Sequence, residues 1–172
     1  MSNSFTLDKQ SLMKKSQGDL KRELVTQHRS KKQKVALTCR ILFSQGHDSG
    51  LAGQITARAE KQDEYYTQPF GFGFDEITTT NLLKVNEDLE IIEGDGIPNP
   101  ANRFHSWIYR ERPDVQCIIH THPIHVSALS MLAIPLKVSH MDACMLYDDV
   151  AFLKKWPGVP VGNEEGKIIA GI

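Results

Sequence analysis

The chain has 172 residues with 40% hydrophobic and 24% charged side chains, which are the length and composition of a single globular domain. Its formal net charge of −1 at pH 7 gives no general attraction to nucleic acid or to an anionic membrane, and we expect neither partner. Three widely spaced cysteines, the lack of a signal sequence and the lack of an apolar run of membrane-spanning length together predict a cytoplasmic protein.

The first part of the chain is expected to hold a polar extension followed by helix. Residues 1–18 are polar and are predicted to be frayed or extended, so that the domain itself would comprise residues 19–172. Apolar residues recur at helical spacing between Leu20 and Phe43, and the polar piece in their middle indicates a bend or an exposed turn. Gly46 follows this stretch at the place where a helix stop is expected.

The next segments carry the signals of short strands and tight turns. The sequence GLAGQITAR combines two glycines with a β-prone run, and we expect a strand over Gln54–Arg58. The aromatic, glycine-rich piece over 68–78 indicates a loop or a bulged strand. Residues 81–96 favour two short strands around a turn at Glu87–Asp88, and a Gly-Asp-Gly turn closes them.

Helices and strands alternate in the second half of the chain. Asn99 can cap a helix, Pro100 suits its first turn and Pro113 ends it. Because the elements interleave, we expect a layered α/β fold whose sheet edges are formed by hairpins. The last helix has no stop signal before the chain ends, so we expect the domain to be incomplete at its C-terminus. The elements after Pro113 are a strand over 115–119, a helix over 123–132, a strand over 136–141 and a helix over 163–172.

The most informative stretch is IIHTHP, in which two histidines end a predicted strand and a proline follows. Alternation along the strand places His120 and His122 on one face, with Cα atoms about 6.6 Å apart. Their imidazoles can therefore converge on one divalent cation, and zinc binds histidine nitrogen at about 2.0–2.1 Å. Pro123 ends the strand, so that the pair can face an open cleft. A bare His-x-His pair also occurs among histidines that are merely exposed or hydrogen-bonded, and that alternative stays open.

The segment RFHSWIYRERPDVQCIIHTHPIHVSALSML resembles the central part of the class II aldolase and adducin head-domain family. The likeness runs from about Val35 to the C-terminus, and GLAGQITAR and FDEITTTNLLKVN are similar to the family's glycine–asparagine loop and the hairpin after it. The resemblance implies a three-layer α/β/α fold with a central, largely antiparallel sheet. It implies a homotetramer with active sites at the subunit interfaces. It also implies a divalent ion, usually Zn²⁺, that polarises the substrate and is held by the His-x-His pair and a third histidine.

The resemblance supplies candidate site residues and also leaves gaps. The family's catalytic glutamate aligns with Ala101, so no catalytic residue is assigned. The third histidine ligand has no counterpart, because no histidine follows His140. The positions that match the family's motifs are His120 and His122 for the metal, and Gly53, Gln54 and Asn99 for the substrate.

Other residues are candidates to fill these gaps. His140 or one of the aspartates near it is a possible replacement ligand, and Glu76 is a possible base, although a solvent-exposed position explains each of them as simply. The family's phosphate-binding serine pair aligns with Asn99 and Pro100, which argues against a phosphorylated substrate. Arg58 is the candidate cation that could compensate for the missing serines.

Two functions are therefore open at this stage. The first is a metal-dependent, aldolase-like lyase that acts on a small sugar-derived or hydroxy-carbonyl substrate. The second is a non-catalytic module, similar to the adducin head, that keeps the fold for oligomerisation or binding. The intact His-Thr-His-Pro motif favours the first function, whereas Ala101 and the missing third histidine favour the second.

Overall fold

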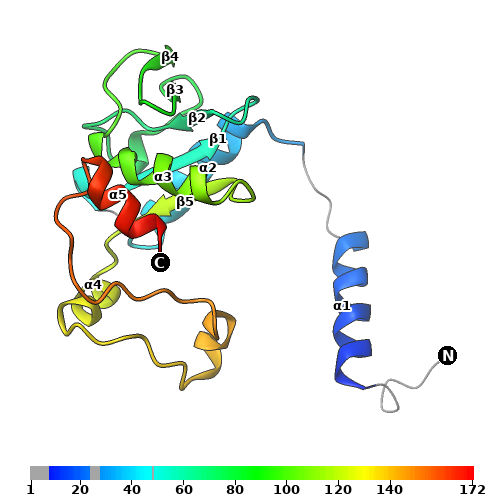
Figure 1. Cartoon of the computed structure of the whole chain (residues 1–172). Coiled ribbons are helices and arrows are strands. Elements are labelled where there is room, and N and C mark those ends of the chain that lie inside the picture. The colour runs from blue at the N-terminus through cyan, green and yellow to red at the C-terminus, as the bar shows by residue number, and fades with distance from the viewer. Residues whose placement is uncertain (1–7, 24–27, 48) are drawn as a thin grey trace.

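A computed structural model describes residues 8–23, 28–47 and 49–172 (Figure 1). In this part of the chain five strands form one antiparallel sheet with the order β4-β3-β2-β1-β5. The strands are β1 Gln54–Arg58, β2 Glu64–Thr67, β3 Leu83–Asn86, β4 Ile91–Glu93 and β5 Cys117–His120. The helices are α1 Lys9–Glu23, α2 Lys31–Ser44, α3 Arg103–Glu111, α4 Ile124–Met131 and α5 Asn163–Ala170. None of the described helices has the length and apolarity needed to cross a bilayer.

Helices cover both faces of the sheet, which confirms the expected three-layer α/β/α fold with an antiparallel sheet. Neighbouring residues of a strand point to opposite faces, and β2 shows the consequence. Tyr66 belongs to the core beneath α2, whereas Tyr65 stacks on Tyr109 of α3 with ring centroids 4.5 Å apart. Helix α5 packs along α3 (Figure 1). The core on the α2 side consists of Val35, Ala36, Cys39, Ile55, Ala59, Tyr66, Phe74, Ile77 and Leu82.

Helix α3 is fixed to the sheet by a buried polar network. His105 Nδ1 lies 2.8 Å from Thr56 Oγ1, and the Tyr109 hydroxyl donates to the Thr56 carbonyl oxygen at 3.0 Å. The Arg58 guanidinium donates to the carbonyl oxygens of Tyr109 and Val115, each at 2.8 Å. It also lies 4.4 Å from the centroid of the Tyr109 ring. Arg58 is thus a buried structural cation that joins α3 to the strands beneath it, and it is not placed to bind a phosphate.

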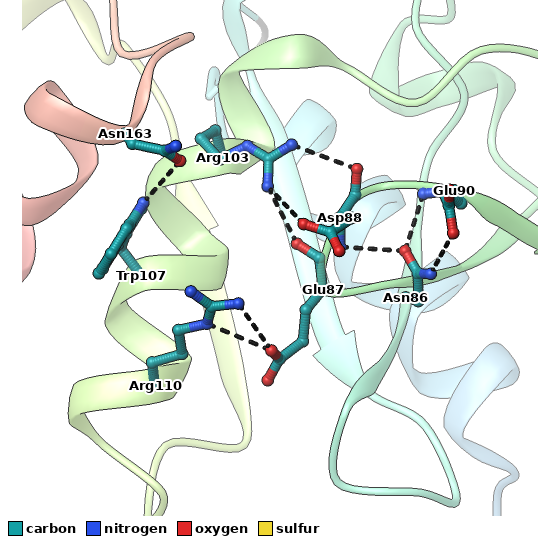
Figure 2. Close-up of polar contacts among 8 residues, drawn as sticks. All are labelled: Asn86, Glu87, Asp88, Glu90, Arg103, Trp107, Arg110 and Asn163. Carbon is teal, nitrogen blue, oxygen red and sulfur yellow. Dashed lines mark hydrogen bonds and ion pairs between the residues drawn. The ribbon is translucent and has the colours of Figure 1, made fainter.

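A second set of contacts ties α3 to the turn between β3 and β4. Figure 2 shows Arg103 donating to the carbonyl oxygens of Glu87 and Asp88, at 3.3 and 3.2 Å. Arg110 donates through two nitrogens to one carboxylate oxygen of Glu87, at 3.1 and 3.2 Å. Such partly exposed ion pairs contribute little free energy singly, so we regard them as fixing the direction of the helix rather than as a source of stability.

Helix α5 docks on α3 through a glycine. A Cβ atom added to the buried Gly166 would lie 2.3 Å from Trp107 Cδ1. The indole of Trp107 contacts two cations, with Arg110 and Lys167 at 5.2 and 4.9 Å from its centroid. Its Nε1 donates to Asn163 Oδ1 at 3.2 Å (Figure 2). Because the indole fills the space where a side chain would lie, α5 can approach α3 this closely only with glycine at position 166.

Most of the predicted elements are confirmed. The strand over 54–58, the two strands around Glu87–Asp88, the strand that leads into His120 and the helices over 123–132 and 163–172 all coincide with observed elements. The helix after Asn99 begins with a 3-10 turn over Pro100–Asn102 before α3, and the Asn99 side chain accepts from the Ala101 N–H at 3.0 Å as a cap.

The helical stretch between Leu20 and Phe43 is two helices rather than one. Residues 24–27, which lie between α1 and α2, are outside the described residues. Helix α2 starts at a capping box, in which Ser30 Oγ accepts the Gln33 N–H and Gln33 Oε1 accepts the Ser30 N–H. This reciprocal pair satisfies two backbone donors that a helix start leaves free.

Two expectations were wrong, and one strand was missed. The stretch over 9–18 is part of α1, because its lysine, glutamine, leucine and methionine residues are strong helix formers; residues 1–7 are outside the described residues. Strand β2 was missed, although its sequence EYYT carries the aromatic signal of a strand. The piece over 136–141 is irregular up to a 3-10 turn at Met141–Leu146, and no described strand pairs with it, so it has no ladder to join.

The pH dependence of stability tests the burial of His105. Burial, and then the nearby His120, lower the pKa of His105 to about 3, from an ordinary value near 6.5. Between these two values the unfolded chain binds a proton that the folded chain does not, so folding loses stability as pH falls from 6.5. We therefore expect His105→Gln to gain about 2 kcal/mol relative to the metal-free parent protein between pH 7 and pH 5.

Urea unfolding at the two pH values measures this difference. His125→Gln, which removes an exposed histidine, is the matched control and should run parallel to the parent. Parallel behaviour of His105→Gln as well would contradict a buried, neutral imidazole at position 105.

The docking of α5 predicts an unusual sign for a glycine substitution. In a free helix, replacing glycine by alanine stabilises by about 1 kcal/mol. Gly166→Ala should instead lower the free energy of unfolding by about 1–3 kcal/mol, because the new Cβ atom displaces the Trp107 ring. Gly18→Ala in α1 is the control, since nothing lies within 4 Å of its added Cβ. Urea denaturation of both variants is the measurement, and a Gly166→Ala protein as stable as the parent would rule out the close contact.

Candidate active site

The His-x-His pair lies where β5 ends, and its two rings meet. His120 Nε2 and His122 Nε2 are 2.8 Å apart, and the ring planes cross at 82°. The register of the sheet places Gln54 of β1 directly opposite His120. Cross-strand partners on one face of a sheet are neighbours, so the imidazoles and this amide share one side of the β1–β5 edge.

Contacts from two other segments hold the histidines in place. The Phe104 ring of α3 meets the His120 ring edge to face, with centroids 5.4 Å apart. The His122 N–H donates to Ser49 Oγ at 2.8 Å. These contacts orient the pair before any ligand arrives, which is the preorganisation that a binding site requires.

The electrostatic surroundings keep His120 neutral at physiological pH. Burial, followed by the neighbouring His122, lowers the pKa of His120 to about 4. Its ring therefore carries no proton on one nitrogen at pH 7, and that nitrogen offers a lone pair. The neutral imidazole is the form that binds a metal ion, so the site favours the state that coordination needs.

The pair opens into a cleft of about 700 Å³. Its floor comes from β1, β5 and the start of α3, and its far wall comes from the segment between α4 and α5. Figure 1 shows that segment running from α4 through a short helical turn, Met141–Leu146, and back to α5. The residues that line the cleft are Leu51, Ala52, Gln54, Phe70, Asn99, Pro100, Ala101, Phe104, His120, His122, Leu153, Trp156, Pro157, Gly158, Val159, Pro160, Val161 and Ile169.

The predicted substrate-binding residues take different places. Gln54 and Asn99 line the cleft. Gln54 Nε2 donates to the Ala52 carbonyl oxygen at 2.7 Å, while its buried Oε1 has no partner among the described residues. Gly53 lies beside the cleft, where a Cβ atom would come within 2.9 Å of Phe74 Cζ. Glycine at position 53 is therefore also needed for packing against the core.

The residues considered as substitutes for missing groups lie elsewhere. The Glu76 carboxylate accepts the Gly73 N–H at 2.8 Å and closes an exposed turn. His140 is exposed, and its Nδ1 accepts the Asp142 N–H at 3.3 Å. The side chains of Glu76, His140 and the neighbouring Asp142 do not line the cleft that holds the histidine pair.

The donor set fits part of a divalent metal site. Two imidazole nitrogens on a tetrahedral zinc ion are about 3.3 Å apart, which small ring rotations can reach from the observed 2.8 Å. Within the described residues no group of three or more histidine, cysteine, aspartate or glutamate side chains is placed to hold an ion. The pair therefore supplies two ligands and leaves the other positions to water, substrate or a further donor.

Comparison with known proteins places the chain among relatives of several kinds. The decarboxylase NovR of Streptomyces niveus is 36% identical over 124 residues, which are 70% of this chain and 46% of that protein. Alpha-adducin of Mus musculus is 30% identical over 141 residues, covering 79% of this chain and 19% of adducin. The solved L-fuculose 1-phosphate aldolase of Glaciozyma antarctica PI12 superposes with a TM-score of 0.72 at 29% identity, over 81% of this chain and 56% of that one.

The chain aligns with only part of the length of each of these relatives. The chain spans about half the length of the first curated relatives it matches, at 46%, 45% and 53%.

The family description "Class II Aldolase and Adducin N-terminal domain" matches residues 33–168, which include every strand of the sheet and both histidines of the pair. The chain is therefore a member of the class II aldolase and adducin N-terminal domain family.

Proposed function

We propose that the chain acts as a metal-dependent lyase. It would break a carbon–carbon bond next to the carbonyl group of a small hydroxy-carbonyl or sugar-derived compound. The observation that carries the proposal is the meeting of His120 and His122 at the floor of a cleft. The names of two relatives support it, because a decarboxylase and an aldolase both cleave such bonds. The activity of those longer proteins is extended to this chain only as part of the proposal.

The residues of the chain divide the work as follows. His120 and His122 would hold the ion, most simply Zn²⁺, and Phe104 would keep the His120 ring from turning away. The ion, when bound, would withdraw electron density from the substrate carbonyl. The free Oε1 of Gln54 would accept a hydrogen bond from a substrate hydroxyl, because it is buried beside the pair without a partner.

Proton transfer is the step for which we assign no side chain of the cleft. Ala101 occupies the wall at the position where the family resemblance expects a catalytic glutamate. The described residues that line the cleft include no carboxylate. We propose that a water molecule in the cleft, or a group from a neighbouring subunit, moves the proton.

Metal analysis of substituted proteins tests the role of the pair. After equilibration with limiting Zn²⁺ and gel filtration, the parent protein should retain about one ion per chain, and His120→Ala and His122→Ala should each reduce zinc affinity at least tenfold, because half of the histidine donor set is lost. His125→Ala removes an exposed histidine five residues along and is the matched control. Equal zinc retention in all four proteins would contradict the proposal.

A second candidate function is a non-catalytic binding module. It is favoured because no carboxylate is among the described residues that line the cleft, and because Ile124, Val126 and Met131 give α4 an exposed apolar surface. An apolar surface of this kind is typical of a protein interface. We propose that α4 contributes to a homo-oligomer, a tetramer by family resemblance, under either function.

Light scattering coupled to gel filtration tests this interface. The parent protein should elute as a tetramer, and Met131→Glu should shift the population towards smaller species, because a buried, unpaired carboxylate opposes association. Met13→Glu changes an exposed methionine of α1 in the same way and should leave the mass unchanged. A tetramer that binds no zinc would favour the module, whereas a tetramer that survives Met131→Glu would place the interface elsewhere.

A further inference from the structure

The wall of the cleft is apolar almost everywhere outside the histidine pair. Among the described residues that line it, the other hydrogen-bonding side chains are the amides of Gln54 and Asn99 and the indole N–H of Trp156. Lysine, arginine, serine and threonine are all absent from the described part of the lining. A phosphate group needs cationic or N–H donors to replace its hydration shell, and these side chains offer few.

The far wall is formed by residues 153–161, which we call the strap. The strap lines the same cleft as the histidine pair. Trp156 lines the cleft while the residue is 75% exposed, so its ring is free to cover a ligand. Pro157 and Pro160 fix the backbone on either side of Gly158, which has a φ of 113°. The strap therefore presents a preshaped apolar surface rather than a polar one.

Two more apolar side chains face the strap from the body of the domain. Leu51 and Phe70 both line the cleft and both remain exposed. Large apolar groups left in contact with water around one cavity lose that contact when an apolar ligand group enters, and burial of apolar area is worth about 25 cal/mol per Å². The cleft therefore gains free energy from an apolar ligand group.

The polar groups gather at one end of the same cleft. His120 and His122 meet there, and the buried Oε1 of Gln54 is without a partner beside them. A ligand that satisfies both ends carries a carbonyl and a hydroxyl at one end and an apolar group at the other. A phosphorylated sugar would leave the apolar strap unused, and its phosphate would find no cationic lysine or arginine side chain among the described residues that line the cleft.

We propose that the cleft selects a hydroxy-carbonyl compound that bears an aryl or branched alkyl group and no phosphate. The apolar group lies against Trp156 of the strap, and the oxygenated end lies at the histidine pair. This deepens the proposed function and rests on it for the role of the pair, but the apolar selection itself depends only on the wall of the cleft.

Calorimetric titration of the full, zinc-equilibrated chain tests the proposal with three probes. 2-Hydroxyacetophenone carries the aryl group, hydroxyacetone is the same hydroxy-carbonyl unit without the ring, and dihydroxyacetone phosphate carries the phosphate. We expect the aryl probe to bind at least tenfold more tightly than either of the others. Equal affinities, or tighter binding of the phosphate ester, would overturn the proposal.

Substitution of Trp156 tests whether the strap is the part of the cleft that selects the aryl group. Trp156→Ala should weaken binding of 2-hydroxyacetophenone at least fivefold and leave hydroxyacetone unchanged. Tyr147→Ala, which removes an exposed aromatic side chain that does not line the cleft, should change neither. An aryl preference that survives Trp156→Ala at full strength would show that the strap does not select.

These titrations, read together with the metal analysis of His122→Ala, separate this inference from the proposed function. If zinc is retained through His122 but the aryl preference is absent, the metal role stands and the apolar selection is wrong. If the aryl preference is present but zinc content does not depend on His122, the selection stands and the proposed lyase chemistry is wrong.

Discussion

The antiparallel pairing of β5 with β1 is the constraint on which the site depends. It sets His120 opposite Gln54 and ends the sheet at the residue where two imidazoles can turn towards each other. A shift of one residue in this register would turn His120 to the α2 face of the sheet, away from Phe104 and the cleft. The position of the site is therefore a consequence of strand register, and the register is held by the cores on the two faces.

Helix α3 links this strand register to the walls of the cleft. Its inner face reaches the sheet through His105 and Tyr109, and the same helix presents Phe104 to the His120 ring. Its outer face carries Trp107, against which Gly166 places α5 and therefore the end of the strap. One short helix thus connects the orientation of the histidine pair with the position of the apolar wall of the cleft.

The sequence alone was sufficient for what local pattern and spacing determine. Alternation predicted that His120 and His122 share a face, proline and asparagine marked the helix starts, and the family resemblance predicted the layers of the fold. The network around Arg58 could not be predicted from the sequence, because its partners are backbone carbonyls brought together from distant segments. The strap was also missed, since no local pattern says which cavity a loop will cover.

The coordination of bound zinc tests the central claim most directly. X-ray absorption spectroscopy of the zinc-loaded protein should show a first shell of nitrogen and oxygen at about 2.0–2.1 Å, with the outer-shell scattering of two imidazoles. Cys117 and Cys144 are free and exposed, so they are the competing soft ligands of the described chain. A first shell with sulfur at about 2.3 Å, or one without imidazole scattering, would contradict the histidine pair as the metal-binding element.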